Sequence, residues 1–157
     1  VIGVKRTLSG VDPGSLHLDL LYGTSDLRTA LAAGQNVVIV APHTPDTEGM
    51  IGAAELALLP QGAVFINIGR GALVDEPALI EALRSGQLLG AGLDVFRQEP
   101  LQADSPFWEM ENVIIFPHSA STSERENGRI TDIFCDNLRR FLANEPLINL
   151  FDASRGF

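Results

Sequence analysis

Residues 63–76 read AVFINIGRGALVDE, and this stretch decides the fold. Its first six residues form an apolar run, typical of a strand in a parallel sheet that is buried on both faces. Asp75 then supplies an N-cap, Pro77 is tolerated in a first helical turn, and Ser85-Gly86 ends the helical pattern. The stretch therefore predicts a strand, a loop with Arg70 between two glycines, and a helix.

The same alternation continues on both sides of this stretch. Apolar runs at residues 1–4, 37–40, 90–95 and 113–116 predict further strands, and residues 37–40 are apolar throughout, as expected of a strand buried on both faces. Helical patterns cover residues 26–33, with Ser25 as N-cap and Gly34 as a stop, and residues 52–59, which end before Pro60. Residues 121–124 form a capping box that predicts the start of a long amphipathic helix. Strands that alternate with helices predict an α/β fold with a parallel sheet.

Three short polar segments follow predicted strands, at residues 67–71, 94–100 and 116–120. They contribute an arginine, a glutamate and a histidine, a set able to bind an anion, orient a base and move a proton. In parallel sheets ligands bind outside the carboxyl ends of the strands. We therefore expect these segments to form one site.

The composition sets loose limits on function. The 157 residues carry a formal net charge of −9, which argues against nucleic acid or an anionic membrane as the main partner. The single cysteine, Cys135, is interpreted as a structural thiol, and no residue spacing suggests a metal site. The sequence shows neither a membrane-spanning apolar run nor a signal-peptide pattern, so a cytoplasmic location is expected.

At residues 69–76, 92–101 and 117–118, and in the loop at 41–47, the sequence resembles the D-isomer-specific 2-hydroxyacid dehydrogenase family. The resemblance covers almost the whole chain and implies a Rossmann-like, doubly wound parallel sheet. It also implies a catalytic trio and a set of residues that line the dinucleotide. The catalytic trio is Arg70, Glu99 and His118. The residues expected to line the cofactor are Ala41, Pro42, Thr47, Ile68, Gly69, Arg70, Asp94, His118 and Ala120. Lys5, Arg6 and Thr7 are added to this set because they lie at the end of the first predicted strand.

The resemblance also shows what this sequence lacks. Dinucleotide folds normally open with a strand and a G-x-G-x-x-G turn, whereas this chain begins on what resembles the second strand. We expect residues 1–143 to form a partial dinucleotide-binding domain. Residues 144–157 are expected to form a C-terminal tail that returns toward a substrate domain outside this chain. The isolated chain is expected to be catalytically inactive.

The three catalytic candidates fit the reduction of a 2-keto acid. The reaction needs a hydride at the carbonyl carbon, which the cofactor supplies, and a proton at its oxygen. His118 suits the proton step because imidazole titrates near neutral pH, and a neighbouring carboxylate such as Glu99 would stabilise the imidazolium. Arg70 would bind the substrate carboxylate with its planar fork of donors.

The cofactor preference is predicted from the end of the first strand. NAD-preferring folds usually place an Asp or Glu there, next to the ribose 2′-hydroxyl. This chain has Lys5, Arg6 and Thr7, which would attract a 2′-phosphate. We expect NADP to be preferred over NAD, the alternative being that these cations are simply solvated surface charges. The resemblance further implies a homodimer.

Each residue has a structural alternative when taken alone. Arg70 could satisfy loop carbonyls, Glu99 could be a solvated turn residue, His118 a loop histidine and Asp94 a turn cap. Their common position after strands favours function. Two hypotheses remain, an NAD(P)-dependent 2-hydroxyacid dehydrogenase of the glyoxylate/hydroxypyruvate reductase kind, and a dinucleotide-sensing binding module without activity, as in corepressors of this fold.

Overall fold

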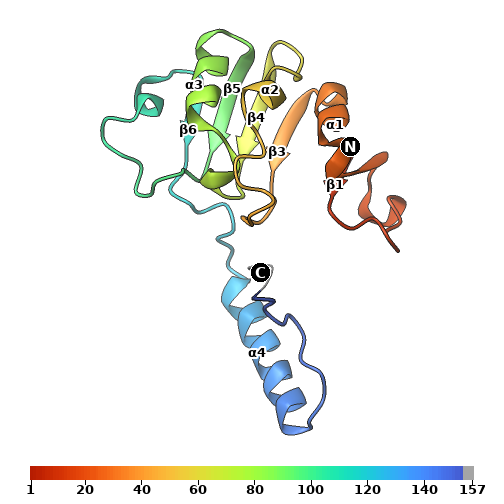
Figure 1. Cartoon of the computed structure of the whole chain (residues 1–157). Coiled ribbons are helices and arrows are strands. Elements are labelled where there is room, and N and C mark those ends of the chain that lie inside the picture. The colour runs from red at the N-terminus through yellow and green to blue at the C-terminus, as the bar shows by residue number, and fades with distance from the viewer. Residues whose placement is uncertain (154–157) are drawn as a thin grey trace. The chain divides into compact units, whose positions relative to one another are not determined.

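The computed structural model describes residues 1–153, in which parallel strands alternate with helices (Figure 1). The chain divides into two compact units, Val1–Pro117 and His118–Phe157. The strands are β1 (Ile2–Lys5), β2 (Leu20–Gly23), β3 (Asn36–Ile39), β4 (Ala63–Asn67), β5 (Leu88–Leu93) and β6 (Val113–Ile115). The α-helices are α1 (Leu27–Ala33), α2 (Ala53–Leu56), α3 (Glu76–Arg84) and α4 (Glu126–Leu142), and 3₁₀ turns cover Gly14–Leu16, Thr24–Asp26, Gly71–Leu73 and Pro106–Glu109.

All strand pairs in the first unit are parallel, as predicted. Strands β3, β4, β5 and β6 lie side by side in that order, and β1 pairs with β2 in a separate two-stranded sheet. Ile39 pairs with Asn67, Asn67 with Leu93, and Leu93 with Ile115. The four strands therefore end level with one another, so the loops that follow them emerge along one edge.

The core of the first unit lies between one face of the four-stranded sheet and helices α2 and α3 (Figure 1). Phe65 of β4 and Leu79 of α3 are 0% and 1% exposed, and burial of each such side chain contributes about 1.5–3 kcal/mol. Helix α3 follows the sequence closely, because the side chain of Asp75 accepts a hydrogen bond from the N–H of Ala78 at 3.2 Å. Gly86, with φ at 76°, follows the end of this helix as predicted.

The other face of this sheet carries exposed apolar side chains. Val38 is 52%, Ile114 64% and Phe116 50% exposed, whereas Val37 and Ile39 are buried. The prediction of a strand buried on both faces was therefore wrong for β3 in the described chain. Successive side chains of a strand point to opposite faces, and here α2 and α3 cover only one of them.

Three local features differ from the predictions. Ser25 does not cap α1; a 3₁₀ turn precedes this helix, Asp26 takes the N-cap position, and the Ser25 hydroxyl donates to the Asp26 carboxylate at 3.2 Å. Strand β2 was not predicted at all. The helix predicted over residues 52–59 is shorter, because only α2 has helical geometry there.

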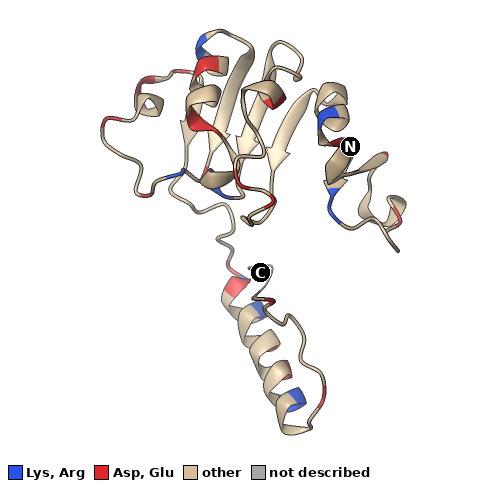
Figure 2. Cartoon of the chain, viewed as in Figure 1, with Lys and Arg blue, Asp and Glu red and all other residues tan. Residues whose placement is uncertain are grey.

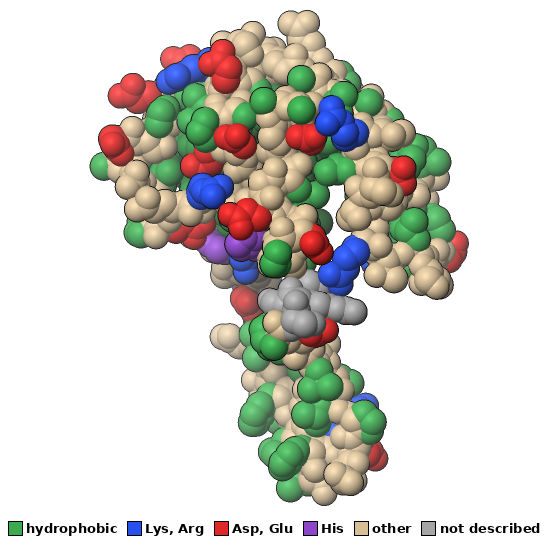
Figure 3. Space-filling view, viewed as in Figure 1, with side chains coloured by type: hydrophobic (Ala, Val, Ile, Leu, Met, Phe, Trp, Pro, Cys, Tyr) green, Lys and Arg blue, Asp and Glu red, His purple; other side chains and the backbone are tan. Residues whose placement is uncertain are grey.

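The second unit is built on α4. The predicted capping box at residues 121–124 was wrong, because α4 begins at Glu126 and its N-cap, Arg125, makes no side-chain capping bond. The Ser123 hydroxyl instead accepts the N–H of Arg125 at 3.2 Å in the turn before the helix. The apolar stripe predicted along this helix is exposed (Figure 3) and consists of Ile130, Ile133, Phe134, Leu138, Phe141 and Leu142.

The segment after α4 folds back along the helix. The side-chain amide of Asn137 donates to the carbonyl of Ile148 at 2.9 Å, and its oxygen accepts the N–H of Ile148 at 2.8 Å. The domain boundary predicted after residue 143 falls within this second unit and stays a prediction. Residues 154–157 of the predicted tail lie outside the described residues. No helix among residues 1–153 is long and apolar enough to cross a membrane.

Candidate active site

The candidate site lies at the carboxyl edge of the four-stranded sheet, where three loops of the first unit meet. These loops follow β3, β4 and β5 and cover residues 40–52, 68–75 and 94–105. The strand order places the loop after β4 between the other two. Two of the three predicted catalytic residues, Arg70 and Glu99, lie on these loops.

Asn67, the last residue of β4, holds the loop that carries Arg70. Its side chain is 2% exposed, donates through Nδ2 to the carbonyl oxygen of Arg70 at 3.1 Å, and accepts the N–H of Gly69 through Oδ1 at 3.1 Å. Its main-chain carbonyl accepts the N–H of Asp94 at 3.0 Å. One buried residue therefore fixes the loop after β4 and connects it to the start of the loop after β5.

The glycines on either side of Arg70 allow close packing between backbones. A Cβ on Gly69 would lie 2.9 Å from the carbonyl oxygen of Ala41, and a Cβ on Gly71 would lie 1.9 Å from the carbonyl carbon of Phe96. A side chain at either position would push a neighbouring loop away. The Gly-Arg-Gly segment is thus the junction of the three loops, with Arg70 providing its long side chain.

Arg70 is exposed at this junction. Its Nη1 donates to the carbonyl oxygen of Gly69 at 2.7 Å. Among the residues that the structure describes, no carboxylate forms an ion pair with it. Because arginine has five N–H donors, most of the fork remains able to bind an anion.

The loop that carries Glu99 is closed by hydrogen bonds to its own backbone. The N–H of Phe96 donates to Glu99 Oε1 at 2.8 Å, and the N–H of Arg97 donates to Glu76 Oε1, at the start of α3, at 2.5 Å. The buried ring of Phe96 packs against Phe107 with 5.9 Å between the ring centroids. The carboxylate of Glu99 is therefore held on an anchored loop.

The loop after β3 is closed by two threonines. Thr47 Oγ1 accepts the N–H of Thr44 and donates to the carbonyl of Pro42, both at 2.8 Å. Thr44 is buried and Ala41 is half-buried. These bonds give the loop a fixed shape, while the predicted contacts of Ala41, Pro42 and Thr47 with a dinucleotide stay predictions.

Two residues at this edge differ sharply in burial. Asp94, at the carboxyl end of β5, is 3% exposed, whereas Ile68, directly after β4, is 41% exposed. Val40, directly after β3, is 69% exposed. The carboxyl edge thus offers an apolar surface beside the polar loops.

His118 and Ala120, two further residues of the predicted site, belong to the second unit. His118 follows β6 by three residues along the chain, and its backbone has φ at 55°, in the left-handed region. Both residues are exposed. Their predicted roles stay predictions.

The residues predicted to bind the 2′-phosphate of NADP lie at the end of β1. Lys5 is the last residue of this strand, and Arg6 and Thr7 follow it; all three are exposed. Figure 2 shows the basic residues in blue at the end of β1. At the opposite end of the β1–β2 pair, the ammonium group of Val1 binds the Asp19 carboxylate and lowers its pKa. That ion pair is exposed and lies away from the carboxyl edge.

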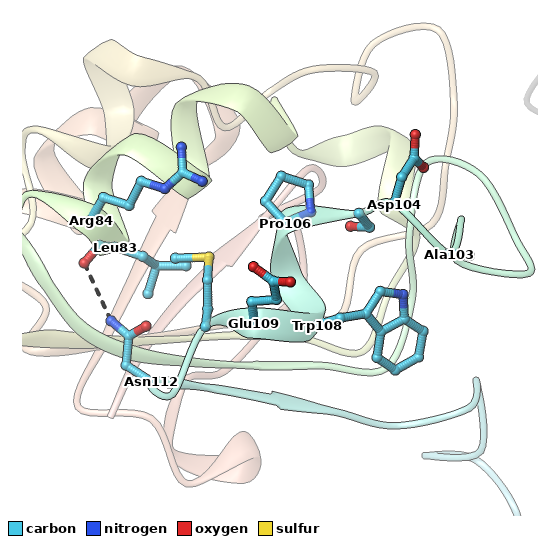
Figure 4. Close-up of a pocket in the computed structure, with 10 residues that line it drawn as sticks. Leu83, Arg84, Ala103, Asp104, Pro106, Trp108, Glu109 and Asn112 are labelled. Atoms are coloured by element: carbon cyan, nitrogen blue, oxygen red, sulfur yellow. Dashed lines mark hydrogen bonds between the residues drawn. The ribbon is translucent and has the colours of Figure 1, made fainter.

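The hollow drawn in Figure 4 is separate from the candidate site. It has a volume of about 530 Å³ and lies at the amino-terminal edge of the sheet, between the end of α3 and the 3₁₀ turn that carries Trp108. None of the predicted site residues lines it. Within residues 1–153, no group of three or more His, Cys, Asp and Glu side chains could hold a metal ion.

Three residues that shape the site were given no role from the sequence: Asn67 and Gly71, which lie within the predicted segment at residues 67–71, and Thr44. Asn67 interrupts an apolar strand with a polar side chain, and this was the signal that could have identified it. Thr44 and Gly71 give no comparable signal, because their roles depend on loops that are distant in the sequence.

A family model for the NAD binding domain of D-isomer specific 2-hydroxyacid dehydrogenases matches residues 1–120. Among curated relatives, glyoxylate/hydroxypyruvate reductase B of Cronobacter sakazakii is 46% identical over 113 residues, which make up 72% of this chain and 35% of that protein. The chain therefore spans about a third of the length of such relatives.

Solved structures agree with this match. A D-isomer specific 2-hydroxyacid dehydrogenase from Xanthobacter autotrophicus Py2, in complex with NADPH and MES, is 42% identical with a TM-score of 0.88, and the match covers 100% of this chain and 62% of that one. An NADPH-dependent glyoxylate/hydroxypyruvate reductase from Sinorhizobium meliloti, in complex with NADP and sulfate, is 34% identical with a TM-score of 0.87, covering 100% and 49%. The α/β, Rossmann-like fold class predicted from the sequence is confirmed.

Proposed function

The chain belongs to the D-isomer specific 2-hydroxyacid dehydrogenase family, and we propose that it carries the cofactor-binding and catalytic part of an NADPH-dependent 2-keto acid reductase. Glyoxylate and hydroxypyruvate are the proposed substrates, because the similar proteins from Cronobacter sakazakii and Sinorhizobium meliloti are named for them. The observation that carries the proposal is Arg70, an exposed residue at the closely packed junction of three loops.

Arg70 binds the carboxylate of the keto acid in this proposal. A planar guanidinium forms paired hydrogen bonds with a carboxylate, which fixes both the position and the orientation of a small substrate. The close packing at Gly69 and Gly71 holds the main chain from which the guanidinium projects. Such positioning lowers the barrier because the reacting groups are already aligned.

His118 donates the proton to the keto oxygen during reduction and accepts it in the reverse reaction. An imidazole can perform both steps near neutral pH. Glu99 is proposed to orient and stabilise the imidazolium, a role that suits a carboxylate whose own loop is anchored through Phe96. These two roles come from the match to the family's motifs at residues 94–100 and 117–118.

The residues at the carboxyl edge fit a dinucleotide. Exposed apolar side chains, Val40 and Ile68, lie beside the polar loops and provide a surface for a planar ring. Ala41, Pro42, Thr47, Gly69, Asp94 and Ala120 are proposed to line the cofactor together with Ile68. When bound, the nicotinamide supplies the hydride.

NADP is proposed as the preferred cofactor. Lys5 and Arg6 place two cations at the carboxyl end of β1, where NAD-preferring folds have a carboxylate. Thr7 adds a hydroxyl donor. The neighbouring structures from Xanthobacter autotrophicus and Sinorhizobium meliloti, which contain NADPH and NADP, are consistent with this preference.

Assembly and location are part of the same proposal. A homodimer is implied by resemblance to the family, and a cytoplasmic location fits a chain of net charge −9 with a single cysteine. A dinucleotide-sensing module without activity remains the second candidate.

A substrate panel separates the two candidates. The full-length polypeptide is mixed with NADPH or NADH and with glyoxylate, hydroxypyruvate or pyruvate, and nicotinamide absorbance is followed. The proposal predicts turnover, with NADPH giving the higher kcat/KM. Tight NADPH binding without turnover of any 2-keto acid would instead support the sensing module.

A further inference from the structure

Asn67 is a buried polar residue in an otherwise apolar strand. It is 2% exposed and lies on the same face of β4 as the core residue Phe65, two residues earlier in the strand. Burying an amide is unfavourable unless its donors and acceptor find hydrogen-bond partners. A valine or isoleucine would suit the strand better, so the partners of Asn67 indicate what the residue contributes.

Those partners are the main-chain groups on both sides of the Arg70 side chain. Nδ2 of Asn67 donates to the carbonyl of Arg70, and Oδ1 accepts the N–H of Gly69, both at 3.1 Å. The same Arg70 carbonyl accepts the N–H of Leu73 at 3.2 Å, which starts the 3₁₀ turn. Only a side chain with a donor and an acceptor can make both bonds.

We infer that Asn67 is a positioning residue for substrate binding, an inference that rests on the proposed function. It fixes the peptide group before Gly69 and the peptide group after Arg70, and thereby restricts the direction in which the guanidinium projects. Through its main-chain carbonyl it also holds the N–H of Asp94 at 3.0 Å, so the loops after β4 and β5 share one support. Asn67 acts on the keto acid only through Arg70.

Replacement by aspartate separates the two side-chain bonds. Asn67→Asp keeps an oxygen that can accept the N–H of Gly69, but it places a second oxygen against the carbonyl of Arg70. The Arg70 side of the loop then shifts, while the Gly69 side, which is proposed to face the cofactor, keeps its bond. Because misplacement by about 1 Å can cost roughly a hundredfold in rate, the keto acid should be affected far more than NADPH.

Asn112 offers a matched control. Its Nδ2 donates to the carbonyl of Leu83 at 3.3 Å, a bond drawn in Figure 4, and the residue is half-buried at the amino-terminal edge of the sheet. Asn112→Asp removes the same type of hydrogen bond and adds the same charge, far along the strands from Arg70. A general loss of stability would appear in both variants.

The experiment compares wild type, Asn67→Asp, Asn67→Ala and Asn112→Asp as full-length proteins. Measurements are the melting temperature, steady-state kinetics with glyoxylate, NADPH affinity from nicotinamide fluorescence, and calorimetric affinity for oxalate, a dicarboxylate that mimics the keto acid. Asn67→Ala has no added charge, so it tests the inference if the aspartate variant does not fold.

Both Asn67 variants should lose about ten- to a hundredfold in kcat/KM for glyoxylate and at least about tenfold in oxalate affinity. Asn67→Asp should keep its NADPH dissociation constant within about threefold of wild type, and Asn112→Asp should keep all ligand constants within about twofold. Asn67 variants whose glyoxylate and oxalate constants match those of Asn112→Asp would overturn the inference. If the wild-type protein reduces no 2-keto acid, but oxalate binds more weakly to the Asn67 variants and not to Asn112→Asp, the proposed function is refuted and the inference stays intact.

Discussion

Replacing Gly71 by alanine is the most specific perturbation of the loop junction. The added Cβ would lie 1.9 Å from the carbonyl carbon of Phe96, 2.1 Å from its oxygen and 2.3 Å from the nitrogen of Arg97. All three are backbone atoms, so no side-chain rotation relieves the overlap. The loop after β5 must move back by roughly 1.5 Å to restore ordinary contacts.

This movement has a cost that the structure allows us to work out. Overpacking of a well-packed region costs about 1–3 kcal/mol, and the displaced segment also carries the hydrogen bonds from Phe96 to Glu99 and from Arg97 to Glu76, worth about 1 kcal/mol each. We expect the free energy of unfolding to fall by about 3–5 kcal/mol, which for a domain of this size is a drop of roughly 6–20 °C in Tm. Since Arg70 and Glu99 would separate, kcat/KM should also fall, by about a hundredfold.

Urea unfolding and keto-acid kinetics of the full-length protein measure both effects. Gly92→Ala is the matched control, because a Cβ at this position in β5 would meet only Ile66 Cγ1, at an ordinary 3.8 Å. The control should change stability by no more than about 0.5 kcal/mol. If Gly71→Ala behaves like the control in both assays, the loops after β4 and β5 are not packed as described.

Three further predictions test substrate binding, cofactor preference and the N-cap of α3. Arg70→Lys should raise the KM for glyoxylate by about tenfold or more with little change in NADPH affinity, because an ammonium cannot replace a bidentate guanidinium, and steady-state kinetics would detect this. Lys5→Asp combined with Arg6→Ala should reverse the cofactor preference from NADP to NAD, and equal kcat/KM with both cofactors in wild type would contradict the proposed role of these residues. Asp75→Ala should lower the free energy of unfolding by about 1 kcal/mol through loss of the α3 N-cap, and a denaturation midpoint equal to that of wild type would show that the cap is unimportant.

Much of the fold could be predicted because its signals are local. The apolar run that forms β4, the cap at Asp75 and the stop at Gly86 are all encoded within a few residues, and the structure contains each of them. The predicted start of α4 was wrong because a short sequence pattern can form more than one local structure. The Ser123 hydroxyl accepts the N–H of Arg125 in a turn, and the sequence alone does not distinguish this turn from a capping box. Strand β2 was missed because its four residues are not part of a longer apolar pattern.

The site was predicted less completely than the fold. Arg70 and Glu99 were predicted as charged residues after strands, and the level strand ends place both on loops at the carboxyl edge, while their catalytic roles stay predictions. Gly71 matters through its contact with the backbone of Phe96 and Arg97, which are distant in the sequence, and no local pattern reports such a contact. Asn67 gives a local signal, a polar residue at the end of an apolar strand, but the sequence alone does not identify its hydrogen-bond partners.

Proton transfer by His118 is the most direct test of the central claim that this chain carries the catalytic groups of a 2-keto acid reductase. The measurement is kcat for glyoxylate reduction by the full-length His118→Asn variant at saturating NADPH, together with its NADPH affinity. We expect a fall in kcat of about two to four orders of magnitude, the usual contribution of general acid–base catalysis, with cofactor affinity almost unchanged. A His118→Asn protein with near-normal kcat would contradict it.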